Sequence, residues 1–382
     1  MCLIETSRRY DRDLLRGVSR YARFHGPWEI FRLPPFYLDP NGRETALKQI
    51  RDWGTDGLIL RENRDLEDKI PAGIPTVVSA ESNERVLGCG NIVGDHEAIG
   101  CMAAKHLLEC GFRNFAYCGF DDVYWSERRR IGFCKTIEAS GHTAAVYQQP
   151  LLPANLLWEK ERPHLEQWLK TLPNPTGLMA CADERSYQIL QACKAVGRSV
   201  PHDIAIIGAD NDELICDLCH PTLSSVAFNT VRVGYEAARL LENMILCDPP
   251  EDQREVVLKP THVTVRQSTD IVATDDHLVA EALRYIRDNA HLPLTVDAVV
   301  EESAVSRRML ERRFERALGI SIYRQIVVMR TKRVEQLLTE TNLTVTQIAE
   351  RLRFSNHQQI DRYFRQCKGM TPKEFRHEVR EV

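Results

Sequence analysis

The sequence predicts a two-lobed α/β domain with parallel sheets, followed by an all-α domain that carries two helix-turn-helix motifs. Three observations lead to this prediction. Short apolar runs alternate with helical patterns up to about residue 266, these runs lack polar alternation, and one helix-turn-helix pattern occurs twice near the carboxyl end. Strand–helix alternation of this kind is typical of doubly wound sheets that are covered on both faces. A chain of 382 residues is too long for one ordinary core.

The predicted strands are short apolar runs, of which Gly57–Leu60 and Ile204–Gly208 are clear cases. The other predicted strands are Leu3–Ile4, Glu29–Leu33, Thr76–Ser79, Asn114–Gly119, Gly177–Cys181, Leu223–Val226 and Thr261–Val265. The predicted helices between them are Asp11–His25, Ala98–Cys110, Glu127–Ser140, Trp158–Leu169, Glu184–Val196 and Val231–Leu246. The polar, aperiodic stretch 267–276 is predicted to be a linker.

Composition indicates a soluble globular protein, with 43% hydrophobic and 27% charged residues. The sequence contains no run of 18 apolar residues, so it predicts no membrane-spanning helix. Met1–Glu5 lacks the basic and apolar segments of a signal peptide, and the twelve cysteines are scattered as reduced thiols would be. We therefore expect a cytoplasmic protein. The net charge of −4 divides unevenly, as +3 over 275–382 and −7 over the remainder, which is the sign expected of a DNA-binding tail on an acidic domain.

Polar side chains follow the predicted strands at their carboxyl ends, where open α/β sheets bind ligands. Carboxylate and guanidinium groups can pair with the donors and acceptors of sugar hydroxyls, and an aromatic ring can cover a pyranose face. The candidate ligand-binding residues are Ser7, Tyr10, Asp11, Arg61, Asp95, Trp125, Arg129, Asp183 and Asp210.

Each of these polar residues could instead cap the helix that follows it. For Asp95, which precedes a predicted helix, the capping role and the ligand role stay open. For Arg129 and Asp210 we favour the ligand role.

The segment Cys216–His220 matches C-x-x-C-H, the attachment pattern of c-type haem. Haem attachment of this kind belongs to exported proteins, and no second pair of cysteines or histidines lies at zinc-ligand spacing. We interpret the match as chance, and we expect neither a metal nor another cofactor.

The two helix-turn-helix copies extend over about 294–319 and 343–369, with their terminal glycines, Gly319 and Gly369, 50 residues apart. Ser306 is the predicted N-cap of the second helix in the first copy, and Thr344 with Gln347 forms a predicted capping box in the second. Apolar residues at i and i+4 predict the buried faces, so the intervening polar residues face outward.

These outward residues have the chemistry that reads base edges and phosphates. Arginine pairs with guanine, glutamine with adenine, and glutamate accepts from cytosine in the major groove. Arg307 is expected to contact phosphate, which adds affinity without sequence information. The candidate DNA-binding residues are Arg307, Arg308, Glu311, Arg312, His357, Gln358, Gln359 and Arg362.

The stretches Val200–Asn211, Arg129–Phe133 and Asn91–Asp95 resemble the effector domain of LacI-type regulators, and such matches extend over roughly 3–266. The resemblance implies the fold of periplasmic sugar-binding proteins, with Arg129 and Asp210 in a cleft between two lobes. LacI-type repressors carry their DNA-binding motif at the amino end, and this chain has no room for one before its first strand.

Residues from about 277 to 377 resemble the AraC/XylS family, most clearly in Ile348–Phe354 and Met370–Pro372. Two positions depart from that pattern: Arg353 stands where the family has glycine in the turn, and Val300 where a small alanine packs. A positive φ at Arg353 would cost about 1 kcal/mol.

The combination of these two domains resembles regulators of xylose operons, also through Tyr10–Arg12 and Gly208–Glu213. It implies an effector-binding domain over 1–266, a linker over 267–276 and a DNA-binding domain over 277–382. The implied partners are double-stranded DNA, a pentose effector such as D-xylose, RNA polymerase and a second copy of the chain. We expect a sugar-responsive activator and no enzymatic activity.

Alternatives remain open at this point. A repressor, or a regulator that responds to another sugar, fits the same residues. A sugar-metabolising enzyme is disfavoured because the chain lacks G-x-G-x-x-G, Walker and G-x-S-x-G motifs.

Overall fold

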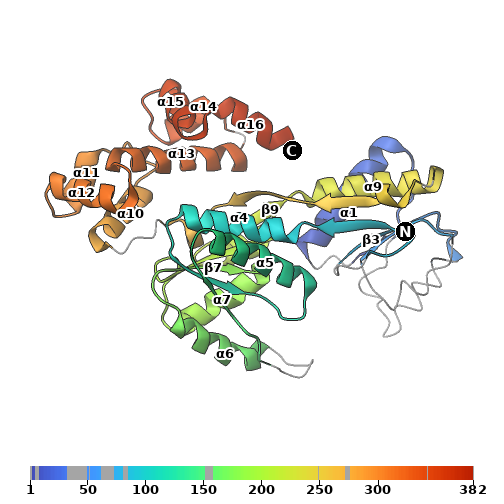
Figure 1. The fold of residues 1–382 in the computed structure, drawn as a ribbon. Helices are drawn as coiled ribbons and strands as arrows, with labels where there is room; N and C mark the ends of the chain where they lie inside the picture. Colours follow the sequence, from blue (N-terminus) through green and yellow to red (C-terminus); the bar gives the residue numbers. More distant parts are fainter. Residues whose placement is uncertain are drawn as a thin grey trace. The chain divides into compact units, whose positions relative to one another are not determined.

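The computed structural model describes residues 2–4, 8–31, 50, 52–61, 73–80, 85–150, 158–247, 249–271, 276–341 and 343–381 (Figure 1). The chain forms two compact units. Unit 1 comprises 1–109 and 113–270, and unit 2 comprises 110–112 and 271–382. The division at 270/271 falls inside the predicted linker. No helix among the described residues is long and apolar enough to span a bilayer.

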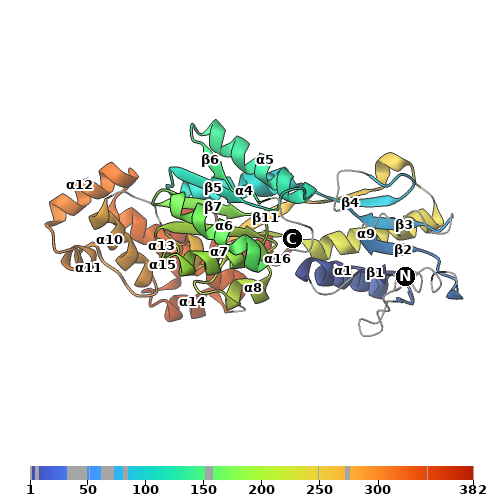
Figure 2. The ribbon, with the colours of Figure 1, turned by 90° about the horizontal axis from the view of Figure 1, so that it is seen from below.

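The first lobe of unit 1 contains a five-stranded parallel sheet in the order β1-β2-β3-β4-β10. Its strands are β1 (Cys2–Leu3), β2 (Leu58–Arg61), β3 (Thr76–Ser79), β4 (Gly90–Gly94) and β10 (Glu255–Leu258). The helices α1 (Arg9–His25) and α9 (Thr230–Leu246) pack side by side in this lobe (Figure 2). Their backbones approach closely at Gly17 and Gly234: a Cβ atom at Gly234 would lie 2.0 Å from the carbonyl oxygen of Leu14.

The second lobe contains a six-stranded sheet in the order β11-β9-β8-β7-β5-β6, which is parallel except for β11 at the edge. Its strands are β5 (Asn114–Cys118), β6 (Ala144–Val146), β7 (Thr176–Ala180), β8 (Ile204–Ala209), β9 (Ser224–Phe228) and β11 (Pro260–Thr264). Its helices are α4 (His96–Glu109), α5 (Tyr124–Ala139), α6 (Trp158–Thr171), α7 (Asp183–Ala195) and α8 (Glu213–Leu218). A second glycine pair, Gly100 and Gly132, allows α4 and α5 to pack closely.

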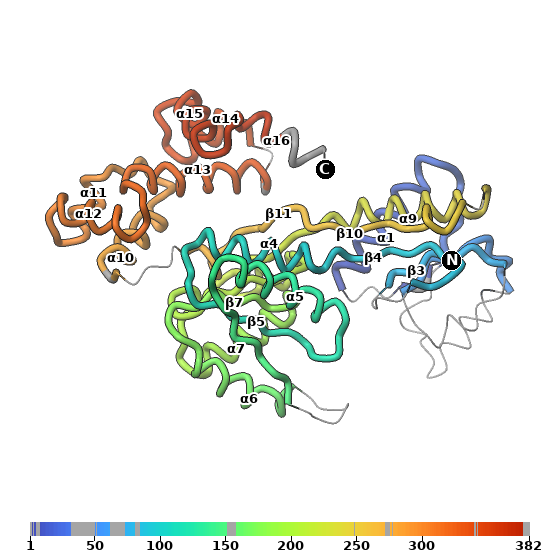
Figure 3. Tube along the Cα trace, in the orientation of Figure 1, coloured from blue at the N-terminus to red at the C-terminus, as the bar shows by residue number. Residues whose placement is uncertain are grey.

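Within the described residues the chain passes between the lobes at β4–α4, at β9–α9 and at β10–β11 (Figure 3). The predicted α/β architecture of two parallel sheets is therefore confirmed. The one antiparallel strand lies at a sheet edge, as is common in folds of this class.

Several element predictions were wrong or incomplete. No strand forms over 29–31, and 32–33 lie outside the described residues. The sequence reasoning missed β6, β10 and α8, and it marked β4 only through Asp95, which follows the end of that strand. Residues 267–269 form a 3-10 helix in which Ser268 and Thr269 are buried. Unit 1 thus continues beyond the predicted boundary at residue 266.

Unit 2 is helical. Its helices are α10 (His277–Asp288), α11 (Val296–Glu302), α12 (Arg307–Leu318), α13 (Ile322–Glu340), α14 (Val345–Arg351), α15 (His357–Lys368) and α16 (Pro372–Glu381). One core lies among α10–α13 and includes Leu310 and Phe314, and a second lies among α13–α16 and includes Ile360 and Phe364. We call α10–α12 the first helix-turn-helix unit and α14–α16 the second.

The predicted caps of unit 2 are confirmed. The side chain of Ser306 accepts from the backbone N–H of Met309, and Thr344 with Gln347 forms the capping box. Gly319 and Gly369 are left-handed where α12 and α15 end. Arg353 has the positive φ expected from its place in the turn, at 51°.

Candidate effector site and nucleic-acid interface

In the first lobe, Tyr10, Asp11 and Arg61 lie together at the carboxyl ends of strands. Asp11 is 2% exposed and accepts hydrogen bonds of 2.7 Å from Arg61 Nη1 to both of its carboxylate oxygens. The hydroxyl group of Tyr10 lies 2.9 Å from that of Ser79 at the end of β3. The structure therefore brings three of the predicted ligand residues into one cluster. Ser7 lies outside the described residues.

In the second lobe, the guanidinium group of Arg129 is the centre of another cluster. Nη2 of Arg129 donates to Asp210 at 3.2 Å, and Nη1 donates to the carbonyl oxygen of Cys181. The guanidinium carbon lies 5.0 Å from the ring centre of Trp125 and 5.7 Å from that of Phe228. Arg129 is 5% exposed, yet its Nε has no hydrogen-bond partner among the described residues. A buried guanidinium with an unused donor is suited to bind a polar ligand.

Asp183 and Asp210 have different surroundings. Asp183 is fully buried and accepts from the backbone N–H of Asp212 and the hydroxyl of Ser225, both at 2.7 Å. Burial raises the pKa of Asp183 well above its usual value, and the neighbouring Asp210 raises it further. Burial also raises the pKa of Asp210, while Arg129 acts in the opposite direction. Asp183 therefore holds the turn after β8 in place, and Asp210 lies against the arginine.

The turn after β8 is held in a left-handed conformation. Asp210 has a φ of 107° and Asn211 a φ of 49°, which strains residues other than glycine. Bonds to Asp183 and Ser225 stabilise this conformation. Such strain at a strand end is typical of functional sites, because the surrounding structure must enforce it.

Asp95 caps a helix. Its carboxylate accepts from the backbone N–H of Ala98 at 3.1 Å in the first turn of α4. Of the two roles that the sequence left open, the structure shows the capping role.

His96 follows Asp95 and was not predicted. Its Nδ1 is buried without a hydrogen-bond partner among the described residues, and its ring lies edge-on to that of Tyr124 at 6.3 Å. Burial, together with the nearby charges of Arg129 and Arg128, lowers the pKa of His96 to about 3. The imidazole is therefore neutral at physiological pH. Its place directly after a strand end was the only sequence signal that could have found it.

The amino end of α1 joins the two clusters. Arg9 donates to the carbonyl oxygen of Asn211 and lies 3.3 Å from the carboxylate of Glu213, and Arg12 lies 3.6 Å from that of Asp212. Phe228, which contacts Arg129, also packs with Tyr10 against the core of the first lobe. Residues of both lobes thus surround one region.

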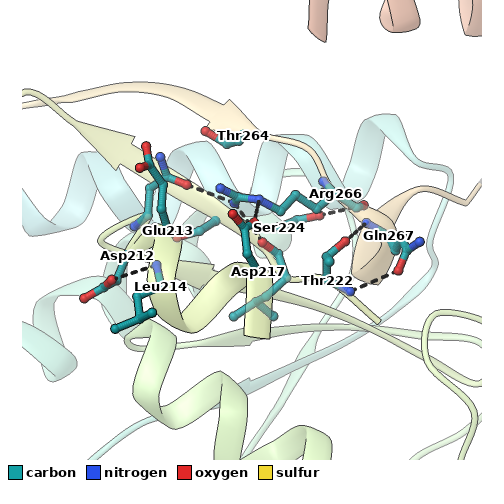
Figure 4. A network of polar contacts seen from close by, with 12 residues as sticks. Asp212, Glu213, Leu214, Asp217, Thr222, Ser224, Thr264, Arg266 and Gln267 are labelled. Carbon is teal, nitrogen blue, oxygen red and sulfur yellow. Dashed lines mark hydrogen bonds and ion pairs between the residues drawn. The ribbon is translucent and has the colours of Figure 1, made fainter. Parts of the chain in front are cut away.

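The segment that leaves unit 1 is bonded to the same turn. Nη1 of Arg266 donates to the side-chain oxygen of Asn211 and to the carbonyl oxygen of Leu223, both at 2.9 Å. Its Nε lies 3.2 Å from Asp217, and its backbone exchanges hydrogen bonds with the hydroxyl of Ser224 (Figure 4). Arg266 therefore joins the carboxyl end of unit 1 to the turn beside Asp210.

On α12 the predicted DNA-binding residues Arg307, Arg308, Glu311 and Arg312 are all exposed. Arg307 pairs with Glu311 at 2.9 Å and with Asp297 at 2.8 Å. Arg308 and Arg312 form no ion pair among the described residues, so their guanidinium groups are available to a ligand.

On α15, His357, Gln358 and Arg362 are exposed and Gln359 is half-buried. The amide oxygen of Gln359 accepts from the backbone N–H and the hydroxyl of Ser355, at 3.1 and 2.9 Å. The amide oxygen of Gln359 is therefore occupied by Ser355, directly before the start of α15. Recognition of adenine requires both the oxygen and the nitrogen of the amide, so Gln359 is less suited to it. The sequence pattern did not reveal this bond.

Family models match most of both units. A periplasmic binding protein-like domain matches 104–269, and a helix-turn-helix domain matches 299–378. The chain is 30% identical to the xylose operon regulatory protein of Escherichia coli K12 over 98% of its own length and 95% of that protein. It is also 30% identical to the protein of that name from Haemophilus influenzae, over 98% and 97%. A solved xylose-binding transcription activator covers 99% of this chain, with 28% identity and a TM-score of 0.64.

Proposed function

The chain belongs to the family of xylose operon regulatory proteins, and from this membership we propose that it is a sugar-responsive, DNA-binding transcriptional regulator with D-xylose as its effector. The observation that carries the proposal is the near full-length similarity to these regulators, which includes both the sugar-binding and the DNA-binding parts. In this proposal the effector-binding domain extends to residue 270 rather than 266, and a linker to residue 276 leads to the DNA-binding domain over 277–382.

The sugar is proposed to bind between the clusters of Arg129 and Asp11. The unused Nε of Arg129 and Nδ1 of His96 can pair with hydroxyl groups, and Asp210 can accept from them. Trp125 offers an aromatic face for the apolar side of the ring. Buried polar atoms without hydrogen-bond partners favour a ligand that supplies such partners, because each unpaired atom costs about 1–3 kcal/mol.

Effector binding is proposed to favour the state in which the lobes are joined through α1. Arg9 and Arg12 make their bonds to the turn 211–213 only when the two lobes are close together. A sugar that contacts Asp11 and Arg129 at once would stabilise that state, and a ligand shifts an equilibrium only by such a difference in affinity.

DNA is proposed to bind through α12 and α15, each in a major groove about one helical turn from the other. Arg308, Arg312 and Arg362 are the proposed base-reading residues, with Gln358 beside them. Arg307, which is paired with two carboxylates, is assigned to phosphate. A homodimer on paired half-sites that activates transcription through RNA polymerase completes the proposal.

Calorimetry on the full chain with D-xylose, other pentoses and a hexose panel tests the effector. We expect binding of D-xylose and a higher affinity for operator DNA in its presence. Tight binding of another sugar, with no binding of D-xylose, would show that the other sugar is the effector. A sugar that releases the protein from DNA and raises transcription would identify a repressor instead.

A further inference from the structure

Arg330 of α13 is a buried cation that contacts both helix-turn-helix units. Its side chain is 4% exposed. Nη1 donates to the carbonyl oxygen of Leu292 at 2.5 Å, and Nη2 donates to that of Leu352 at 2.8 Å. Leu292 lies between α10 and α11, and Leu352 is the C-cap residue of α14. One planar side chain therefore bonds to the backbone of the first helix-turn-helix unit and to that of the second.

The position of Arg330 is the junction of the two cores of unit 2. Ile326 and Met329 belong to the core of the first helix-turn-helix unit, whereas Val327 and Val334 belong to that of the second. Among the described elements, α10 and α11 pack against α13, as do α14, α15 and α16, whereas the helices of the two sets make no comparable contacts with each other. The relative placement of the two helix-turn-helix units therefore depends on α13 and on the bonds that its side chains make.

The surroundings of Arg330 are costly for a charge. No carboxylate forms an ion pair with it in the described part of the chain, and its Nε is buried without a hydrogen-bond partner. Burial lowers the pKa of the guanidinium. An apolar side chain of similar size would avoid the desolvation of a cation. Core stability alone therefore does not explain an arginine here, whereas a requirement for two fixed backbone contacts does.

The contacts of Arg330 lead to both recognition helices. Its guanidinium carbon lies 4.0 Å from the ring centre of Phe354, in the turn before α15. Phe354 in turn packs edge-to-face on Tyr363 of α15, with ring centres 5.7 Å apart. On the other side, the segment after Leu292 enters the core that contains Leu310 and Phe314 of α12.

We propose that Arg330 is a positioning residue that fixes the spacing and orientation of α12 and α15, so that both recognition helices bind one DNA duplex as a unit. This inference rests on the proposed DNA-binding function and adds a cause for the spacing that the DNA site must have. Once one recognition helix has bound, a second helix that is already aligned with the DNA binds intramolecularly, at high effective concentration. This gain in affinity is lost if the spacing between the two helices is not fixed.

The test compares two-segment and one-segment DNA. A preferred duplex is first recovered by the wild-type full chain from a random-sequence library, and each protected segment is then scrambled in turn. We expect Arg330→Met to reduce the preference for the intact duplex over the scrambled ones by about tenfold or more, with affinity for single segments within about twofold of wild type. Arg333→Met, on the exposed face of the same helix, is the matched control and should keep the preference.

Two results would overturn the inference. Arg330→Met could retain the wild-type preference, or it could weaken binding to every duplex equally, which is the effect of a merely structural residue. Arg330→Lys is the second variant: its ammonium group keeps the charge but lacks the planar fork, so it should also lose the preference.

A spacing series with the wild-type chain covers the case in which both variants fail to fold. Insertion of one or two base pairs between the segments should abolish the two-segment preference, and a flat profile would contradict fixed spacing. If the wild-type chain recovers no preferred duplex, the proposed DNA-binding function fails as well. If it does and Arg330→Met matches it, only the role of Arg330 is wrong.

Discussion

Arg129 and Asp210 form a hydrogen-bonded ion pair of 3.2 Å between the end of one strand and the helix after another, with the guanidinium group almost fully buried. The two residues are 81 positions apart in the sequence. Burial raises the pKa of Asp210, and the guanidinium group counteracts this increase, so the arginine favours the charged carboxylate. The pair thus presents a fixed donor and a fixed acceptor to the same region.

Replacement of Arg129 should weaken sugar binding. Arg129→Met removes a charge-assisted donor and leaves the half-buried carboxylate of Asp210 without its partner, so we expect a loss of about 1.5–3 kcal/mol, or roughly 10- to 150-fold in Kd. Calorimetry with D-xylose measures this loss.

The adjacent Arg130 supplies the matched control for this prediction. It pairs with Glu127 on α5 rather than with Asp210, so Arg130→Met should bind D-xylose as the wild type does. Equal affinities of the Arg129 and Arg130 variants would contradict the assignment of Arg129 to the sugar site.

Acidification should destabilise unit 1 through His96. Its pKa is about 3 in the folded protein and about 6.5 in the unfolded chain, so between these values the unfolded state binds more protons. The stabilising contribution is complete above pH 6.5 and is lost as the pH falls towards 3. His96→Leu should make the slope of the urea midpoint against pH less positive between 7.5 and 5, whereas the raised pKa values of Asp183 and Asp210 act with the opposite sign in both proteins.

His164, exposed on α6, serves for comparison. His164→Leu should leave the slope of the urea midpoint against pH as it is in the wild type. An unchanged slope in His96→Leu would show that His96 does not cause the acid sensitivity.

Arg312→Ala and Arg362→Ala should each weaken binding to the recovered duplex by about 1–3 kcal/mol and relax selectivity at one base position. Both side chains are exposed on recognition helices, without an ion pair among the described residues. Quantitative gel-shift titrations at one salt concentration measure the effect.

Unrelated DNA separates base contacts from phosphate contacts. Arg307 is assigned to a phosphate contact. Arg307→Ala should therefore reduce affinity for specific and unrelated duplexes alike and lower the slope of log K against log salt. If Arg312→Ala behaves in the same way, Arg312 contacts phosphate and its assignment to a base is wrong.

Arg353→Gly should stabilise the second helix-turn-helix unit by about 1 kcal/mol, because glycine adopts positive φ without the steric cost that arginine bears. Thermal unfolding of the full chain, followed by the helical signal, measures this gain. Arg351→Gly, in the last turn of α14, is the control and should destabilise by about the same amount. A lower melting temperature for Arg353→Gly would show that the arginine side chain contributes more than its backbone strain costs.

Local chemistry explains which features were predictable. The caps at Ser306 and Thr344 and the glycine ends of α12 and α15 depend on residues within a few positions of one another, and they are confirmed. The edge strands β6 and β10 were missed because their side chains are only partly buried, so they lack the continuous apolar run that marks β2 and β8. Gln359 was assigned to a base because the pattern shows an outward glutamine and not its bond to Ser355.

The sequence by itself determined the strand–helix alternation, the two helix-turn-helix units, Asp210 at the end of a strand and Arg129 in the helix that follows another strand, because periodicity and capping are encoded locally. Tertiary structure decided that Asp95 caps a helix, that His96 is buried and neutral, and that Arg330 holds two backbones at once. These properties depend on desolvation and on partners that are tens of residues away. The sum of such long-range contacts sets the pKa of a side chain and the placement of a recognition helix, and no local pattern contains it.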